Sequence, residues 1–159
     1  MSGIFVKAKI RTHIILLTRG EKGKNPELRV GEFKKAMTWW GFDFTILNFP
    51  DRELSFLPIK EIVLETTKII DRQMITSLMS FSPFEQTVGF DHPDHNVAGE
   101  VTRLVSVAMG GKRGLWLWRS SGKSSLLDDR VAYVRRFYPS QDIPKRVLSQ
   151  IGESYLKVR

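Results

Sequence analysis

The stretch His13-Ile14-Ile15-Leu16-Leu17-Thr18 is a nearly continuous apolar run, and Arg19-Gly20 ends it. Its length and its lack of polar alternation are typical of a parallel strand that is buried on both faces. A strand of this kind needs neighbouring strands of the same character and helices that cover the sheet. The run therefore predicts an α/β fold, for which the rest of the chain must supply the other elements.

Further apolar runs predict strands over residues 44–49, 74–81 and 115–118, and Pro50-Asp51 and Ser82-Pro83 close the first two. Apolar residues at spacings of three and four predict the intervening helices. These helices are expected over residues 30–40, 59–69, 97–108, 131–137 and 143–151. Strands that alternate with helices indicate one α/β domain over residues 1–159 with a mainly parallel sheet.

The composition is ordinary for a globular protein. The chain has 159 residues, of which 42% are hydrophobic and 26% charged, and this length suits one domain with its own core. No apolar run approaches the roughly 20 residues of a membrane-spanning helix, and the first residues lack the apolar segment of a secretory signal. The chain has no cysteine, which excludes thiolate zinc sites and fits a reducing compartment. We therefore expect a cytoplasmic protein.

The net charge of +8 raises the question of an anionic partner. The densest basic group surrounds two tryptophans and consists of Lys112, Arg113, Arg119 and Lys123 with Trp116 and Trp118. Basic side chains among aromatic ones can stack nucleic-acid bases. A solvated loop beside a buried strand has the same pattern, however, so nucleic-acid binding is the least favoured of our hypotheses.

Polar segments follow three of the predicted strands. These segments are Thr18-Arg19-Gly20-Glu21, Pro50-Asp51-Arg52 and the loop over residues 82–95. In sheets of parallel strands the ligand site lies beyond the carboxyl ends of the strands. The sequence therefore predicts that the functional residues lie in these three segments.

Two of the three histidines of the chain lie in Asp91-His92-Pro93-Asp94-His95. His92 and His95 are three residues apart and can face the same side of a first helical turn, which Pro93 suits. Two imidazoles and two carboxylates can supply metal ligands and proton carriers. A capped helix start that carries surface histidines would have the same residues.

The surrounding sequence decides between these alternatives. Residues 91–100, Asp-His-Pro-Asp-His-Asn-Val-Ala-Gly-Glu, resemble the second motif of the PIG-L/LmbE-like zinc-dependent N-acetylglucosaminyl deacetylase family, in which His-Pro-Asp-His runs into a helix. Earlier segments resemble family motifs in the same order, namely a Thr-x-Gly-Glu turn over residues 17–23, an Arg-x-x-Glu helix start over residues 28–32 and Phe49-Pro50-Asp51. Residues 138–141 resemble a Ser-Gln element that histidine usually precedes, and Tyr138 departs from it. The resemblance implies a Rossmann-like three-layer α/β/α fold.

The resemblance also implies zinc-dependent hydrolysis of the N-acetyl group of an N-acetylglucosamine-type sugar or conjugate. In such a reaction zinc polarises the amide carbonyl and activates a water, a carboxylate serves as general base, and a histidine stabilises the oxyanion and protonates the amine. Carried over to this sequence, His95 is the zinc ligand, His92 is the acid or oxyanion-stabilising group, and Asp94 holds His92 in position. Arg29 and Asp51 correspond to substrate contacts.

Three residues near these motifs also have structural interpretations. Arg29 can pair with Glu32 on a solvated helix face, and Asp51 can serve only as a turn residue after Pro50. His13 begins its strand, so we expect it at the end opposite the site, with a structural role.

The first half of the family's metal site has no counterpart in the sequence. A catalytic zinc site generally has three protein ligands and one open position. The family takes two ligands and the general base from an Ala-His-Pro-Asp-Asp-type motif at the end of its first strand, and no second His-Pro-Asp occurs here. We therefore expect a chain that is truncated at its N-terminus relative to the family and lacks that first strand. Its zinc affinity should be weak, and it should have little or no deacetylase activity alone.

A second hypothesis is an intact but non-catalytic relative that binds a sugar or another ligand. The expected partner is an acetylated amino sugar, whose exact identity the sequence leaves open, as it does the oligomeric state.

Overall fold

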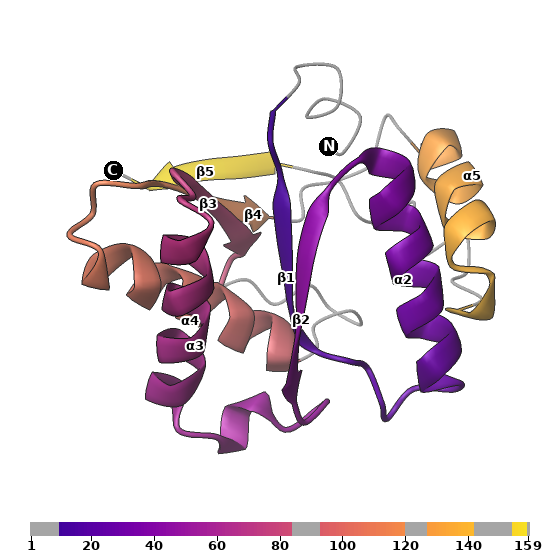
Figure 1. The fold of residues 1–159 in the computed structure, drawn as a ribbon, viewed down its shortest axis with the longest axis horizontal. Coiled ribbons are helices and arrows are strands. Elements are labelled where there is room, and N and C mark those ends of the chain that lie inside the picture. Colours follow the sequence, from indigo (N-terminus) through magenta and orange to yellow (C-terminus); the bar gives the residue numbers. More distant parts are fainter. Residues whose placement is uncertain (1–9, 84–92, 120–126, 142–153, 159) are drawn as a thin grey trace. The chain divides into compact units, whose positions relative to one another are not determined.

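The computed structural model describes residues 10–83, 93–119, 127–141 and 154–158, in which helices alternate with strands (Figure 1). The elements are β1 (His13–Thr18), α2 (Pro26–Trp40), β2 (Asp43–Phe49), the 3-10 helix η1 (Leu54–Phe56), α3 (Ile59–Arg72), β3 (Ser77–Phe81), α4 (Pro93–Ala108), β4 (Gly114–Arg119), α5 (Leu127–Phe137), the 3-10 helix η2 (Pro139–Gln141) and β5 (Ser154–Val158). This order confirms the predicted α/β fold. The helix predicted over residues 143–151 lies outside the described residues.

The chain divides into two compact units. The first takes its residues from Met1–Asp51 and Asp128–Pro144, and the second takes them from Arg52–Leu127 and Lys145–Arg159. We call them the β1–β2 unit and the β3–β5 unit after the strands that they contain. That residues 1–159 act as a single domain stays a prediction.

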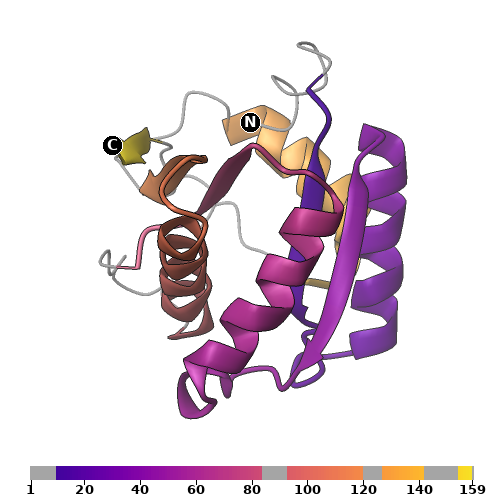
Figure 2. The same cartoon turned by 60° about the vertical axis from the view of Figure 1, so that its left-hand side comes forward.

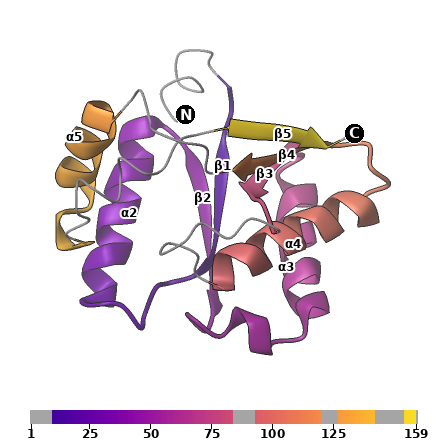
Figure 3. The same cartoon turned by 180° about the vertical axis from the view of Figure 1, so that it is seen from behind.

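In the β1–β2 unit, two parallel strands are covered by a helix. β1 and β2 pair with His13 opposite Asp43 and Leu16 opposite Ile46, and α2 lies beside this pair while α5 lies beside α2 (Figures 1 and 3). The core consists of Phe33, Ala36, Met37 and Phe42, and the partly buried side chains of both strands and of residues 133–138 pack against it. Burial of these apolar side chains is the main favourable contribution to the stability of the unit.

Helix α2 ends where the sequence predicted. The Gly41 backbone has φ 68°, in the left-handed region, and its N–H donates to Thr38 O at 3.1 Å while that of Phe42 donates to Met37 O at 3.0 Å. Glycine reaches this conformation without steric cost and satisfies the last carbonyls of the helix. The helix begins at Pro26, earlier than the predicted Val30, because proline suits a first helical turn.

In the β3–β5 unit, β3 pairs parallel with β4, and β4 pairs antiparallel with β5. α4 packs against β3, and α3 packs against α4 (Figure 2). The core between these layers is apolar and consists of Leu54, Ile62, Ile70, Leu78, Val101, Val105, Leu115 and Leu117. Among the described strands, β1–β2 and β3–β4–β5 form separate hydrogen-bonded sheets. All their pairs except β4–β5 are parallel, as predicted, whereas the loss of a first strand stays a prediction.

Two details of this unit differ from the sequence prediction. β3 begins at Ser77 and not at Met74, because Met74 has φ 52° and closes the turn after α3 by donating its N–H to Asp71 O at 3.0 Å. β5 was not predicted, since five residues of mixed character carry too short a pattern to identify an edge strand. No helix in the described part of the chain is long and apolar enough to cross a membrane.

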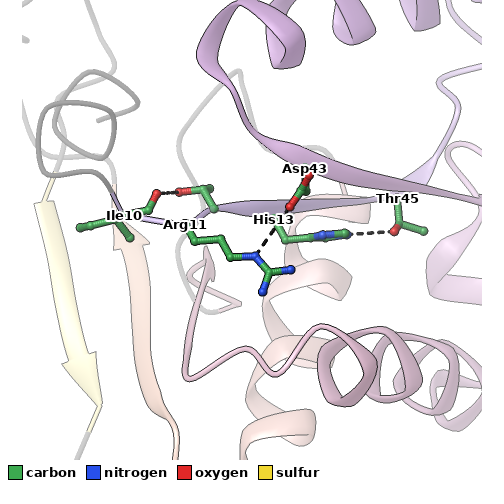
Figure 4. A network of polar contacts seen from close by, with 6 residues as sticks. Ile10, Arg11, His13, Asp43 and Thr45 are labelled. Atoms are coloured by element: carbon green, nitrogen blue, oxygen red, sulfur yellow. Dashed lines mark hydrogen bonds and ion pairs between the residues drawn. The ribbon is translucent and has the colours of Figure 1, made fainter.

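His13 lies at the start of β1, as predicted, and it links the two strands of the β1–β2 unit (Figure 4). Its Nε2 lies 2.9 Å from the hydroxyl of Thr45 on β2, and Arg11 pairs with Asp43 beside it at 3.7 Å. The Nδ1 atom of His13 is buried and has no hydrogen-bond partner among the described residues. The doubly protonated ring carries an N–H at both nitrogens, and no acceptor among the described residues pairs with Nδ1.

The titration of His13 gives a first testable prediction. Burial lowers the pKa of His13 below its ordinary value of 6.5, against the opposing effect of Asp43 and with a smaller contribution from Arg11. The unfolded chain then binds the proton more readily, so the free energy of unfolding should decrease as the pH falls below about 6.5. Urea denaturation at a pH above and a pH below this value measures the decrease. His13→Gln keeps a side-chain amide but does not titrate, so its decrease should be smaller; equal decreases in both proteins would contradict the assignment.

Candidate functional site

The loop after β1 wraps around the guanidinium group of Arg29. Gly20 has φ 69°, and the N–H of Gly23 donates to Gly20 O at 3.0 Å, which closes a tight turn. Arg29, in the first turns of α2, donates from Nη1 to the same carbonyl at 3.2 Å. A Cβ atom at Gly23 would lie 1.9 Å from Nη1, and one at Gly20 would lie 3.1 Å from it. The two glycines therefore leave the space that Arg29 occupies.

Glu21 and Asp51 tie together the carboxyl ends of β1 and β2. The N–H of Asp51 donates to Glu21 Oε1 at 2.5 Å, and the N–H of Lys22 donates to Asp51 Oδ2 at 3.1 Å. The hydrogen bond from Asp51 is the main cause that lowers the pKa of Glu21, although this side chain is exposed. Asp51 thus has the turn role that the sequence allowed, and its role toward a substrate stays a prediction.

Glu32 does not pair with Arg29 and is instead a buried anchor. Its side chain is 4% exposed and accepts from the Ser140 N–H at 2.8 Å and from the Ser140 hydroxyl at 2.6 Å. Ser140 belongs to the Ser-Gln element at residues 138–141, and this element was the only feature of the sequence that pointed to Ser140. Burial, with smaller contributions from Tyr133 and Glu32, raises the pKa of Tyr138 beside it. The sequence alone did not identify this link between α2 and η2.

Asp94 holds the chain segment that follows Asp51. It lies in the first turn of α4, is 7% exposed, and accepts from the Arg52 N–H at 2.7 Å through Oδ2 and from the Leu54 N–H at 3.3 Å through Oδ1. Arg52 has φ 63°, a conformation that costs a residue with a side chain about 1–3 kcal/mol. The carboxylate therefore stabilises a strained turn, while His92, its predicted partner, lies outside the described residues.

His95 lies one residue further along α4, and its ring is fixed against the end of β3. Its imidazole stacks on the ring of Phe81, with the ring centroids 4.3 Å apart and the planes 7° from parallel. Phe81 is the last residue of β3. The imidazole therefore lies against the end of the strand that precedes the motif, in a plane parallel to the ring of Phe81.

The described residues do not by themselves fit a complete zinc site. Among them there is no group of three His, Cys, Asp or Glu side chains that could hold a metal ion. Both carboxylate oxygens of Asp94 accept main-chain hydrogen bonds, and the role of His95 as a metal ligand stays a prediction. Arg29 and Asp51 border the same loop of the β1–β2 unit, and Asp94 and His95 share one helical turn of the β3–β5 unit.

An α/β fold with polar side chains at the carboxyl ends of parallel strands is typical of a domain that binds or transforms a small ligand. The family model for the GlcNAc-PI de-N-acetylases, PIG-L, matches residues 3–106 of the 159-residue chain. The match includes Arg29, Asp51 and the motif at residues 91–95. The chain therefore belongs to the PIG-L family.

Solved structures share the fold over nearly the whole chain. The conserved protein TT1542 from Thermus thermophilus is 22% identical with a TM-score of 0.71, over 98% of this chain and 86% of that one. The N,N'-diacetylchitobiose deacetylase from Pyrococcus horikoshii is 14% identical with a TM-score of 0.67, over 99% and 78%. GalB, the 4-carboxy-2-hydroxymuconate hydratase from Pseudomonas putida KT2440, is 13% identical with a TM-score of 0.65, over 99% and 92%.

These structural similarities establish the fold alone. A deacetylase and a hydratase share it, so the reaction must be argued from the residues of the site. No curated protein sequence matches the chain significantly.

The hydrogen bonds of Asp94 give a second prediction. Asp94→Ala leaves the N–H groups of Arg52 and Leu54 without this acceptor, so the free energy of unfolding should fall by about 1–3 kcal/mol. Urea denaturation followed by circular dichroism measures the change. Asp71→Ala is the matched control, because Asp71 is an exposed carboxylate paired with Arg113, and its loss should change stability by no more than about 0.5 kcal/mol. Equal losses in the two variants would contradict the anchoring role of Asp94.

Proposed function

We propose that this chain takes part in the zinc-dependent hydrolysis of the N-acetyl group of an N-acetylglucosamine-type amino sugar or conjugate. We propose a reducing, cytoplasmic compartment for this reaction. Membership of the de-N-acetylase family, through a match that includes the motif with Asp94 and His95, is the observation that carries the proposal. In this proposal His95 is the metal ligand, His92 and Asp94 act in catalysis, and Arg29 and Asp51 contact the sugar.

The contacts of Arg29 support a role in substrate binding. A guanidinium group has five N–H donors, and the bond to Gly20 O uses one of them. The remaining donors suit sugar hydroxyls or a carboxylate product such as acetate. The glycine turn fixes the side chain before a ligand arrives, which reduces the entropy that binding would cost.

The chemistry of amide hydrolysis defines what the other residues would do. The reaction needs a water nucleophile, a base that takes its proton, and a donor that stabilises the oxyanion and protonates the leaving amine. His92 is the proposed donor, and Asp94 its proposed positioning residue. No residue of the described segments is assigned as the base, and the metal-holding group is incomplete there. We therefore propose that the 159 residues alone turn over substrate slowly or not at all.

The same incompleteness favours a second candidate function, the binding of an acetylated sugar without turnover. The hydratase with the same fold shows that the chemistry of this fold is not fixed. The two candidates differ in their need for zinc, since a sugar-binding relative does not require a metal ligand at position 95.

Zinc binding and acetate release together give the third prediction. The chain is mixed with N,N'-diacetylchitobiose and zinc, acetate release is followed, and zinc affinity is measured by equilibrium dialysis. We expect little acetate, and zinc binding that His95→Ala weakens by about tenfold or more, because even the loss of an outer-shell partner typically costs that much.

His13→Gln is the matched control. It changes a histidine at the start of β1, the end opposite to the loop that follows the strand, and should leave zinc affinity unchanged. Robust acetate release by the 159 residues would contradict the incomplete site. An unchanged zinc affinity in His95→Ala would contradict the ligand assignment and favour sugar binding without a metal.

A further inference from the structure

Gly99 is the point where α4 comes closest to the end of β3. A Cβ atom at this position would lie 2.4 Å from the Phe81 carbonyl oxygen, 2.9 Å from the Pro83 nitrogen and 3.1 Å from Pro83 Cδ. Two of these three atoms belong to the backbone, so a side chain could not be accommodated by rotating a neighbouring group. Any residue larger than glycine must therefore change the distance between the helix and residues 81–83.

Gly99 and His95 lie on the same face of α4. They are four residues apart in one continuous helix, and residues at this spacing lie one above the other. Gly99 contacts the main chain of Phe81, and His95 contacts its ring at 4.3 Å between centroids. The last residue of β3 is thus contacted twice by the same helix face, once through its carbonyl and once through its side chain.

The distance between α4 and residues 81–83 at Gly99 affects how far the His95 imidazole overlaps the ring of Phe81. Stacked rings attract one another over a narrow range of separations and offsets. A shift of the helix by the few tenths of an ångström or more that a methyl group would require would disturb the contact at His95, one turn away. The buried side chains of Val101 and Val105 hold the rest of the same helix in the core, so the helix would tilt or shift at its N-terminal end.

We infer that Gly99 and Phe81 are positioning residues that together set the plane and place of the His95 imidazole. The inference rests on the function proposed for His95, because a ligand or proton carrier acts only when its ring points in a defined direction. Neither residue would touch the substrate. Gly99 sets how closely α4 approaches the strand, and Phe81 provides the surface on which the ring lies.

The test follows the imidazole directly and uses neither sugar nor zinc. Proton–carbon correlation NMR of protein labelled at histidine has only three imidazoles to resolve, and His95→Asn identifies the signal of His95. Stacking on Phe81 should shift the ring protons of His95 upfield. Phe81→Leu should remove this shift, and Phe81→Tyr, which restores an aromatic ring, should retain it.

Gly99→Ala should also reduce or remove the upfield shift while circular dichroism stays that of a folded protein. Gly31→Ala is the matched control, because Gly31 also lies within a helix but a Cβ atom there has nothing within 4 Å. It should leave the His95 signal unchanged and should keep or raise stability, since alanine favours a helix over glycine by about 1 kcal/mol.

The outcomes separate this inference from the proposed function. A folded Gly99→Ala protein with an unchanged His95 signal would overturn the role of Gly99, whatever His95 does. If Gly99→Ala does not fold, the Phe81 variants decide, and a His95 signal that is the same in Phe81→Leu and the unaltered protein overturns the inference. If the signals move as expected but His95→Ala leaves zinc affinity unchanged, the positioning stands and the proposed function fails.

Discussion

Carboxylates that accept main-chain N–H groups hold this chain where it leaves its strands. Glu21 and Asp51 do so reciprocally at the ends of β1 and β2, and Asp94 does so for Arg52 and Leu54. Peptide N–H groups that leave a strand lose their ladder partners, and an unpaired buried one is costly. The carboxylates replace the lost partners, so the conformations of the segments that follow β1 and β2 depend on them.

These contacts explain what the sequence could and could not reveal. The apolar run at His13–Thr18, the glycine that ends α2 and the motif at the start of α4 are local patterns, and each one gave a correct element. The side chains of β1 are only partly buried and not buried on both faces as predicted. The Glu32–Ser140 bond joins residues 108 positions apart, and the Asp94–Arg52 bond joins residues 42 positions apart. Pairings at such separations depend on how the elements pack, and local periodicity does not encode them. The close approach at Gly99 likewise required the structure.

The site was predictable in its residue types but not in the environment of each residue. The spacing of His92, Asp94 and His95 indicated a chemical motif, and the structure adds that Asp94 is a buried acceptor and that His95 stacks on Phe81. The alternative of an Arg29–Glu32 ion pair was wrong, because Arg29 donates to the Gly20 carbonyl while Glu32 is buried and accepts from Ser140. Asp94, a residue of the family motif, therefore holds the scaffold, and its part in the site stays a proposal.

We propose that residues at the anchored strand ends bind an acetylated amino sugar. Amide proton–nitrogen NMR spectra recorded while N,N'-diacetylchitobiose is added test it most directly. We expect shifts concentrated at Gly20–Gly23, Asp51–Leu54 and the first turn of α4, and a loss of the shifts at the glycine turn in Arg29→Ala. Shifts confined to other surfaces, such as the exposed aromatic side chain of Trp39, or an absence of shifts at saturating sugar, would contradict it.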